Sequence, residues 1–247
     1  MPDWPEGVDR LVLPTTDSTS LEAARLAPQV PTWILAQEQT AAHGRRGRAW
    51  SMPRGNFAAS LAWRPGGGPA ERALRSFVAS LALHDALTAM GVAGLSLKWP
   101  NDVLLEGGKL AGILLESPKD NLLVLGIGIN LIAAPEAADL ETGALSAVSL
   151  LKATGLRVTP EEMLDALAPA FATREAQLVT HGFAPIRTAW LDRAARLGDR
   201  ITARLMNDTI TGVFETVDAE GHLVLRTEGG RRSLPAADVY FGEAPCS

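Results

Sequence analysis

The sequence predicts an α+β fold in two parts, and three observations support this. Before Gly198, short apolar runs that read as strands are interspersed with segments whose apolar residues recur at helical spacing. After Gly198, short strands separated by turn residues are typical of a small all-β module. The chain has 247 residues, 47% hydrophobic and 21% charged, which is enough for a main domain and a small one. We therefore expect a main domain over 1–197 and a β domain over 198–247.

The first strand and helix of the main domain are marked by a capping pattern and by prolines. Residues 11–13 read as a short strand. Thr19 and Glu22 have the spacing of a capping box, which predicts a helix with Thr19 as its N-cap. Pro28 and Pro31 keep this helix brief, because proline is poorly tolerated inside helices.

The middle of the main domain reads as strands around one helix. Strands are predicted over 33–36, 57–63, 95–99, 110–116 and 122–129, with a connection through Asn101 and 107–108 between the third and fourth. A turn at 65–69 leads into the helix, which Gly91 ends. Its apolar face holds Leu74, Phe77, Val78 and Leu81.

Two more helices and the β module complete the chain. Thr159 and Glu162 form a second capping box, with Pro160 at the first helical position. The helix that follows carries Met163, Leu164, Leu167 and Phe171, and a shorter one holds Ile186, Trp190 and Leu191. Strands of the β module are predicted over 201–205, 210–217, 223–227 and 232–234, with turns at 207–208, 218–221 and 229–230.

Charge, cysteine count and hydropathy exclude several classes of protein. Lys plus Arg is 23 and Asp plus Glu is 28, and the net charge of −5 argues against a generally basic surface for nucleic acid. The single cysteine, Cys246, can form neither an intramolecular disulfide nor a thiolate metal site. The longest apolar run, 122–129, falls far short of the roughly 20 residues of a membrane-spanning helix. The acidic, proline-containing N-terminus is unlike a signal peptide. We expect a soluble cytoplasmic protein without a membrane partner.

The loop at residues 43–48, His-Gly-Arg-Arg-Gly-Arg, is the first of three candidate functional segments. Glycine lets the backbone approach a ligand, and guanidinium groups bind phosphate or carboxylate through several donors. Taken alone, such a loop is more often a solvated basic segment or a general nucleic-acid patch.

The other two candidate segments are a polar turn and a lysine at the start of a strand. Lys98 ends a strand and is followed by Asn101 and Asp102, whose oxygens suit Mg²⁺. A plain turn in which Asn and Asp bond their own backbone is the simpler alternative. Lys109 starts an apolar strand, in which Gly112 indicates close approach by a ligand or another backbone. Together, the three segments predict a cationic pocket for a substrate with carboxylate and phosphate groups.

Familiar nucleotide-binding and hydrolase motifs are absent from the sequence. It contains neither a G-x-x-x-x-G-K-S/T loop nor a G-x-G-x-x-G run between a strand and a helix. It has no G-x-S-x-G elbow, and its four histidines lack metal-ligand spacing.

Six motifs, taken in order, resemble those of the biotin protein ligases. They are Asp17-Ser-Thr-Ser20, Gln39-Thr-Ala-Ala-His-Gly-Arg-Arg-Gly-Arg-Ala-Trp50, Gly55-Asn-Phe57, Lys98-Trp-Pro-Asn-Asp102, Lys109-Leu-Ala-Gly-Ile-Leu-Leu-Glu116 and Gly126-Ile-Gly-Ile-Asn130. The resemblance covers about residues 10 to 240. It implies a mixed sheet flanked by helices, of the class II synthetase-like type, followed by a small SH3-like β-barrel.

The resemblance implies an ATP-dependent, AMP-forming ligase that works in two steps. Biotin carboxylate attacks the α-phosphate of ATP, giving biotinyl-5′-AMP and pyrophosphate. A lysine of a biotin carboxyl carrier domain, from acetyl-CoA carboxylase or another biotin-dependent carboxylase, then takes the biotinyl group. Joining two anions requires a cationic site and Mg²⁺, but no protein nucleophile. The loop at 43–48 is the expected lid that keeps water from the adenylate.

The family pattern also implies roles for individual residues. The biotin-binding set is Ser18, Thr19, Ser20, Gln39, His43, Arg45, Lys109 and Gly112. The ATP-binding set is Arg45, Arg48, Trp50, Asn101, Asp102 and Asn130, with Asp102 also the candidate Mg²⁺ ligand. Lys109 is the expected main catalytic residue, accompanied by Arg45 and Lys98.

Two positions depart from the family pattern. Ala42 and His43 stand where many relatives have the first Gly-Arg of the loop, so this loop carries less positive charge and has a stiffer hinge. We hypothesise that the adenylate is held less tightly, or with more pH dependence, than in relatives with arginine. Ser20 stands where asparagine often follows Ser-Thr, and its reach is shorter.

Rival interpretations come from two classes. A lipoate or octanoate ligase or transferase of related fold is the nearest, and a non-catalytic biotin sensor is the second. A DNA-binding repressor is not expected, because about ten residues precede the first strand and a helix-turn-helix domain does not fit. Relatives occur as monomers and as sheet-edge dimers, so a homodimer is one of two alternatives that the sequence leaves open.

Overall fold

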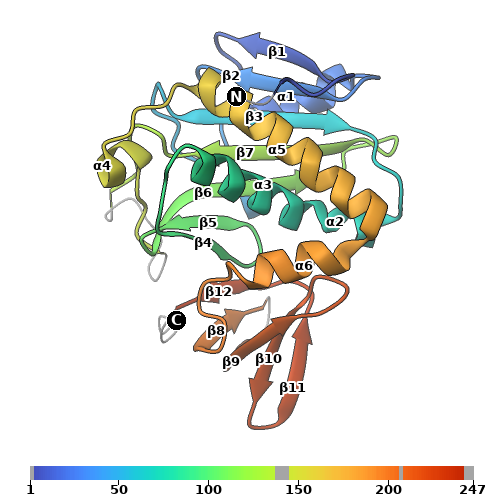
Figure 1. Cartoon of the computed structure of the whole chain (residues 1–247), viewed down its shortest axis with the longest axis vertical. Coiled ribbons are helices and arrows are strands. Elements are labelled where there is room, and N and C mark those ends of the chain that lie inside the picture. Colours follow the sequence, from blue (N-terminus) through green and yellow to red (C-terminus); the bar gives the residue numbers. More distant parts are fainter. Residues whose placement is uncertain (1–2, 137–144, 206–207, 242–247) are drawn as a thin grey trace.

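A mixed seven-stranded sheet forms the main part of the molecule (Figure 1). The computed structural model describes residues 3–136, 145–205 and 208–241. The strand order across the sheet is β1 (Asp9–Leu13), β2 (Thr32–Ala36), β3 (Phe57–Trp63), β7 (Leu123–Ile129), β6 (Gly108–Glu116), β5 (Asp102–Leu105) and β4 (Leu95–Lys98). The pair β1–β2 is parallel, and the other neighbours are antiparallel. The expected α+β fold with a mixed sheet is confirmed.

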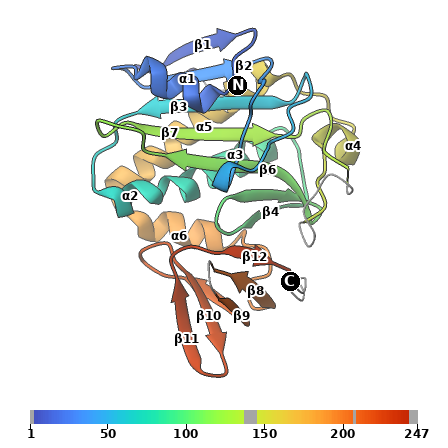
Figure 2. The same cartoon turned by 180° about the vertical axis from the view of Figure 1, so that it is seen from behind.

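Helices cover the two faces of this sheet unequally. Helices α3 (Arg75–Ala89) and α5 (Pro160–His181) lie across one face, joined by α2 (Pro69–Ala73) and α6 (Phe183–Leu191) near its edge (Figure 1). Helix α1 (Thr19–Leu26) lies on the opposite face, against β3 and β7 (Figure 2). Helix α4 (Leu150–Thr154) lies at the end of the sheet. Much of the second face is therefore left without a helix.

The pleat of the central strands makes the two faces chemically different. Alternate residues of a strand point to opposite faces. The side chains that join the large core with α3 and α5 are Ala59, Leu61, Ala111, Ile113, Leu125 and Ile127. Several residues on the other face are small, and they lie in register as Ser60 with Gly126 and Gly128 with both Ala58 and Gly112. Small side chains leave space above the sheet, so this face has a low floor.

A five-stranded antiparallel sheet forms the C-terminal module. Its order is β11 (Gly230–Leu234), β10 (Leu223–Thr227), β9 (Thr209–Val217), β8 (Arg200–Arg204) and β12 (Asp238–Tyr240). The arrangement agrees with the expected SH3-like domain. The module contacts the main sheet directly, because Trp99 Nε1 donates to the carbonyl oxygen of Gly221 at 3.1 Å. The boundary predicted at 197/198 lies between α6 and β8 and stays a prediction.

Several local predictions need correction. Residues 102–105 form β5, where a connection was expected, and α2, α4 and β12 were not foreseen. The first capping box is wrong, because Ser18 is the N-cap of α1 and Thr19 lies inside the helix. Glu22 instead pairs with Arg25. The second box is confirmed, since Thr159 and Glu162 cap each other's orphan groups at the start of α5. Cys246 and Asn207 lie outside the described residues.

Within the residues that the structure describes, no helix combines the length and the apolar character needed to cross a membrane.

Candidate functional site

A cavity of about 430 Å³ lies over the small residues of the second face of the sheet, the face that carries α1. The loop over 37–56 crosses this face in front of β6 and β7 (Figure 2). The residues lining the cavity come from the start of α1, this loop, strands β3 to β7 with the turns beside them, the segment between β7 and α4, and β12 of the C-terminal module. All of the residues predicted for the site from the sequence line this one cavity: Ser18, Thr19, Ser20, Gln39, His43, Arg45, Arg48, Trp50, Lys98, Asn101, Asp102, Lys109, Gly112 and Asn130.

One end of the cavity is lined by uncharged hydrogen-bonding groups. Thr19 and Ser20, in the first turn of α1, are 4% and 6% exposed. Gln39 Oε1 accepts the backbone N–H of Thr19 at 2.7 Å, which satisfies an amide that the start of a helix leaves without a partner. Ser60, fully buried on β3, donates its hydroxyl to Thr19 Oγ1 at 2.8 Å and lies 3.1 Å from Ser20 Oγ. This neutral end is thus a packed set of hydroxyl and amide groups.

Sequence reasoning missed Ser60. The available signal was the polar residue within an otherwise apolar run, Phe57–Trp63, on the same face as the glycines of β7. Because its hydroxyl donates to Thr19, the Thr19 hydroxyl keeps its own hydrogen for a group in the cavity.

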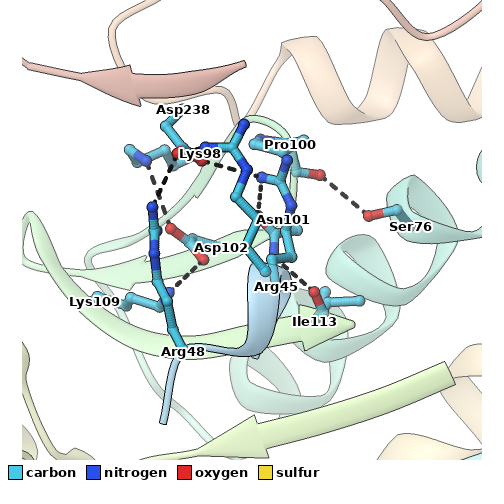
Figure 3. A network of polar contacts seen from close by, with 11 residues as sticks. Arg45, Arg48, Ser76, Lys98, Pro100, Asn101, Asp102, Lys109, Ile113 and Asp238 are labelled. Carbon is cyan, nitrogen blue, oxygen red and sulfur yellow. Dashed lines mark hydrogen bonds and ion pairs between the residues drawn. The ribbon is translucent and has the colours of Figure 1, made fainter. Parts of the chain in front are cut away.

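The other end of the cavity is a cluster of charges built on β4, β5 and β6. Lys98 and Asp102 pair across the β4–β5 hairpin with Nζ and Oδ2 3.5 Å apart. Lys109 Nζ lies 2.7 Å from the other oxygen of Asp102 (Figure 3). Burial favours a raised pKa for Asp102, but Lys109 and Lys98 outweigh it and hold that pKa below its ordinary value. Burial lowers the pKa of Lys98 below its ordinary value, and the negative charge of Asp102 offsets part of this lowering.

Asn101 ties the basic loop to the sheet. Its Nδ2 donates to the carbonyl oxygen of Ile113 at 2.6 Å, and its Oδ1 accepts from Arg45 Nη1 at 3.4 Å. The turn itself is held by Ser76 of α3, whose hydroxyl donates to the carbonyl oxygen of Pro100 at 3.1 Å (Figure 3). The loop over 43–48, called the arginine loop from here on, is therefore connected to the core of the main domain.

Asp238 of β12 is a second functional candidate that sequence reasoning missed. Its carboxylate lies 2.6 Å from Arg46 and 3.0 Å from Arg48, and its other oxygen lies 3.7 Å from Arg45. An isolated aspartate about 190 positions away in the sequence carries no local signal for such a contact. The C-terminal module therefore contributes directly to the cavity.

Trp50 lies on the glycine floor of the cavity. A Cβ atom on Gly128 would come within 2.6 Å of its indole, so this position requires glycine for the packing, and one on Gly112 would make a tight contact at 3.2 Å. Lys109 Nζ is 5.6 Å from the centre of the ring. Trp50 Nε1 and Asn130 Oδ1 are buried without a hydrogen-bond partner among the described residues. A ligand with one acceptor and one donor could satisfy both.

His43 connects the start of the loop to the edge of the cavity. Its Nε2 lies 3.8 Å from Glu116 Oε1 at the end of β6. His43 and Ala49 form an isolated antiparallel bridge that closes the base of the loop.

Comparison with known proteins gives two family matches. The model of the Biotin/lipoate A/B protein ligase family matches residues 12–131, and that of the Biotin protein ligase C terminal domain matches residues 197–242.

Individual relatives resemble the chain along nearly its whole length. The Biotin–acetyl-CoA-carboxylase ligase of Paracoccus denitrificans is 55% identical over 239 residues, covering 94% of this chain and 100% of that protein. The Bifunctional ligase/repressor BirA of Bacillus subtilis is 31% identical, covering 94% of this chain and 72% of that protein. A solved structure of the biotin protein ligase from Aquifex aeolicus in complex with biotin and ATP has 26% identity and a TM-score of 0.81, covering 94% and 97% of the two chains. The chain belongs to the Biotin/lipoate A/B protein ligase family.

Proposed function

We propose that this chain is a biotin–protein ligase, which activates biotin with ATP and transfers it to a lysine of a biotin carboxyl carrier domain. The observation that carries the proposal is one cavity with a neutral hydrogen-bonding end and a cationic end. The naming of the Paracoccus denitrificans relative as a biotin–acetyl-CoA-carboxylase ligase supports it.

The neutral end suits the uncharged ureido ring of biotin. In this proposal the Thr19 hydroxyl donates to the ureido oxygen, since Ser60 occupies the acceptor side of that hydroxyl. Ser18, Ser20 and Gln39 complete the ring pocket, and the biotin chain then runs over the glycine floor toward the charged end. Neutral polar recognition of this kind excludes charged rings, because a buried unpaired charge is costly.

The charged end brings two anions together. We assign the biotin carboxylate and the α-phosphate of ATP to the space beside Lys109 and Arg45. The carboxylate oxygen attacks the α-phosphorus, an O–P bond forms, and the bond to the bridging oxygen of the β-phosphate breaks, releasing pyrophosphate. Lys109 stabilises the charge that develops on the α-phosphate, with Lys98 as a second cation behind Asp102. Arg48, Trp50, Asn101, Asp102 and Asn130 are the proposed partners of the nucleotide.

Transfer follows on the same face. The acceptor lysine, as a neutral amine, attacks the carbonyl carbon of biotinyl-5′-AMP, forms an amide and releases AMP together with one proton. No protein nucleophile takes part in either step. The loop over 43–48 covers the intermediate in this scheme and limits its hydrolysis.

The protein offers few ligands of its own for Mg²⁺. Among the described residues, no group of three or more His, Cys, Asp or Glu side chains could hold a metal ion. The Asp102 carboxylate fits as one oxygen ligand, and nucleotide phosphates would supply the rest, as is usual for Mg²⁺ at nucleotide sites. When bound, Mg²⁺ would screen the triphosphate charge.

The remaining expectations concern partners and place. The acceptor is a carrier domain of acetyl-CoA carboxylase or of another biotin-dependent carboxylase. The cytoplasm is the expected place of the reaction, in keeping with the proposed use of ATP. Both a monomer and a homodimer fit the proposal.

Mass spectrometry of a purified carrier domain tests the proposal. With biotin, ATP and Mg²⁺, the carrier should gain one biotinyl group. A carrier whose acceptor lysine is replaced by arginine, and a reaction without ATP, are the controls. A gain with lipoate or octanoate in place of biotin would retain the family and overturn the substrate. Biotin binding without transfer would favour a sensor.

A further inference from the structure

Asp238 is the acidic group that faces the arginine loop from the C-terminal module. Figure 3 shows its carboxylate between Arg45 and Arg48, beside Lys98 and above Asp102. It forms ion pairs with Arg46, Arg48 and Arg45 at 2.6, 3.0 and 3.7 Å. Two of these contacts are also charge-assisted hydrogen bonds, which are the strong class of such bonds.

The carboxylate is the fixed partner in this contact. The Asp238 side chain is 12% exposed, whereas Arg46 and Arg48 are 49% and 43% exposed. Strand β12 holds Asp238 in place by pairing with β8, where Asp238 lies opposite Arg204. Because the acid is nearly buried on a paired strand and the arginines are exposed, we take the acid as the group that determines the position of the loop.

The backbone of the loop is strained at this contact. Arg46 has φ 57° and ψ 26°, in the left-handed region that non-glycine residues rarely adopt, and Gly47 follows with φ 71°. Such a conformation persists only where surrounding contacts determine it. Arg46, the residue with the strained backbone, donates a hydrogen bond from its side chain to Asp238. This contact therefore acts directly on the strained residue.

We propose that Asp238 is a positioning residue of the ligase reaction: it holds the arginine loop closed over the nucleotide end of the cavity. The C-terminal module then contributes to ATP binding without touching the reacting atoms. Arg45 and Arg48 reach the phosphates from a loop that is already placed, so less ordering is needed when ATP binds. The kinetic part of this inference rests on the proposed function, whereas the structural part does not.

Asp238→Asn tests the proposal because it keeps the shape of the side chain and removes its charge. In the protein without substrates, trypsin should cut after the loop arginines about ten-fold faster than in the unchanged protein, since the closed loop protects those bonds. With biotin and a carrier domain, KM for ATP should rise by a similar factor, about ten-fold, while kcat changes little. Loss of a merely structural contact would lower the thermal midpoint without this split between KM and kcat.

Glu228→Gln is the matched control, because Glu228 is exposed in the same module. It should leave both readouts unchanged. Arg46→Ala removes the contact from the loop side and leaves the C-terminal module intact. The Arg46→Ala, Asp238→Asn double variant should therefore raise KM for ATP no more than Asp238→Asn alone, since Asp238→Asn already weakens the contact with Arg46.

Three results would overturn the proposal. They are an unchanged tryptic rate in Asp238→Asn, additive effects in the double variant, and a fall in KM for ATP, which would mean that Asp238 competes with phosphate for the arginines. Failure of the proposed function would instead abolish transfer in the unchanged protein and leave the tryptic comparison intact.

Discussion

The two ends of the cavity differ in how they are built. The neutral end lies on α1 and β3, where Thr19, Ser20 and Ser60 are packed against each other inside the main domain. The charged end is assembled from a hairpin, a loop and the C-terminal module, where Asp102 and Asp238 each hold basic groups. The first end is preorganised by packing, whereas the second depends on ion pairs between separate segments.

This difference suggests that the neutral end binds the uncharged ring of the substrate, whereas the charged end binds the groups that react. A preformed neutral pocket can bind an uncharged ring before any other ligand arrives. A cluster of cations held together by two carboxylates concentrates positive charge where the phosphates bind. We therefore expect changes at the neutral end to alter affinity for the biotin ring, and changes at the charged end to alter the binding of anionic groups and, at Lys109, the rate of adenylate formation.

Lys109→Ala should have the largest effect. Removal of a cation that stabilises the charge developing on the α-phosphate should lower the rate of biotinyl-AMP formation by at least about 100-fold. Single-turnover formation of the adenylate measures this directly. Lys119→Ala, a change at an exposed lysine beyond the end of β6, is the control. A rate within a few-fold of the unchanged protein would remove Lys109 from the chemistry.

Asp102→Asn should affect stability next most strongly. Leaving Lys98 buried without its partner should lower the free energy of unfolding by about 3 kcal/mol at pH 7. The pKa of Asp102 is lowered in the folded state, so its stabilising contribution is present above its ordinary pKa of 3.8 and is lost as pH falls through the lowered value. Urea unfolding at several pH values should show the two proteins converging only in acid. A difference independent of pH would contradict this account.

Ser60→Ala should act on biotin binding alone. Loss of one buried hydrogen bond to Thr19 should raise KM for biotin about five-fold and leave kcat unchanged. Steady-state kinetics with varied biotin provides the measurement, and Ser117→Ala, at an exposed serine, is the control. A fall in kcat at unchanged KM would place Ser60 in the chemistry instead.

His43→Arg should have the smallest effect. His43 Nε2 lies 3.8 Å from Glu116 Oε1, and arginine at this position would place a permanent positive charge beside that carboxylate. Release of biotinyl-AMP should be about two- to three-fold slower with arginine than in the unchanged protein, because the ion pair with Glu116 helps to hold the loop over the adenylate. Equal release rates for both proteins between pH 6 and 8 would exclude a role for His43 in retention.

The sequence predicts most residues of both ends of the site and misses one at each end, Ser60 and Asp238. Thr19, Gln39 and Lys109 belong to motifs that are local in the chain, so their types and spacing are visible without a structure. The alternating glycines of β7 indicate that one face of the sheet carries small residues. Ser60 could have been found because it lies on that face, opposite Gly126. The contact of Asp238 with the loop depends on how two modules dock, which no local pattern records.

The same reason explains the errors in secondary structure. The capping box at Thr19 failed because its hydroxyl is used by Ser60, so tertiary contacts replaced the local cap. Strand β5 was missed because its four residues lie between two turns and are defined by pairing with β4 and β6. Longer elements with a clear period, such as β3 and α5, were identified from the sequence.

The most direct test of the two-ended site compares biotin with biotinol, its uncharged alcohol analogue, by calorimetry in three proteins. The unchanged protein should bind biotin at least about ten-fold more tightly, because the carboxylate meets the cationic end. Lys109→Ala should lose most of that preference, whereas Ser60→Ala should weaken both ligands equally and keep it. A full preference for biotin in Lys109→Ala, or a lost preference in Ser60→Ala, would contradict the division of the cavity into a ring-binding end and an anion-binding end.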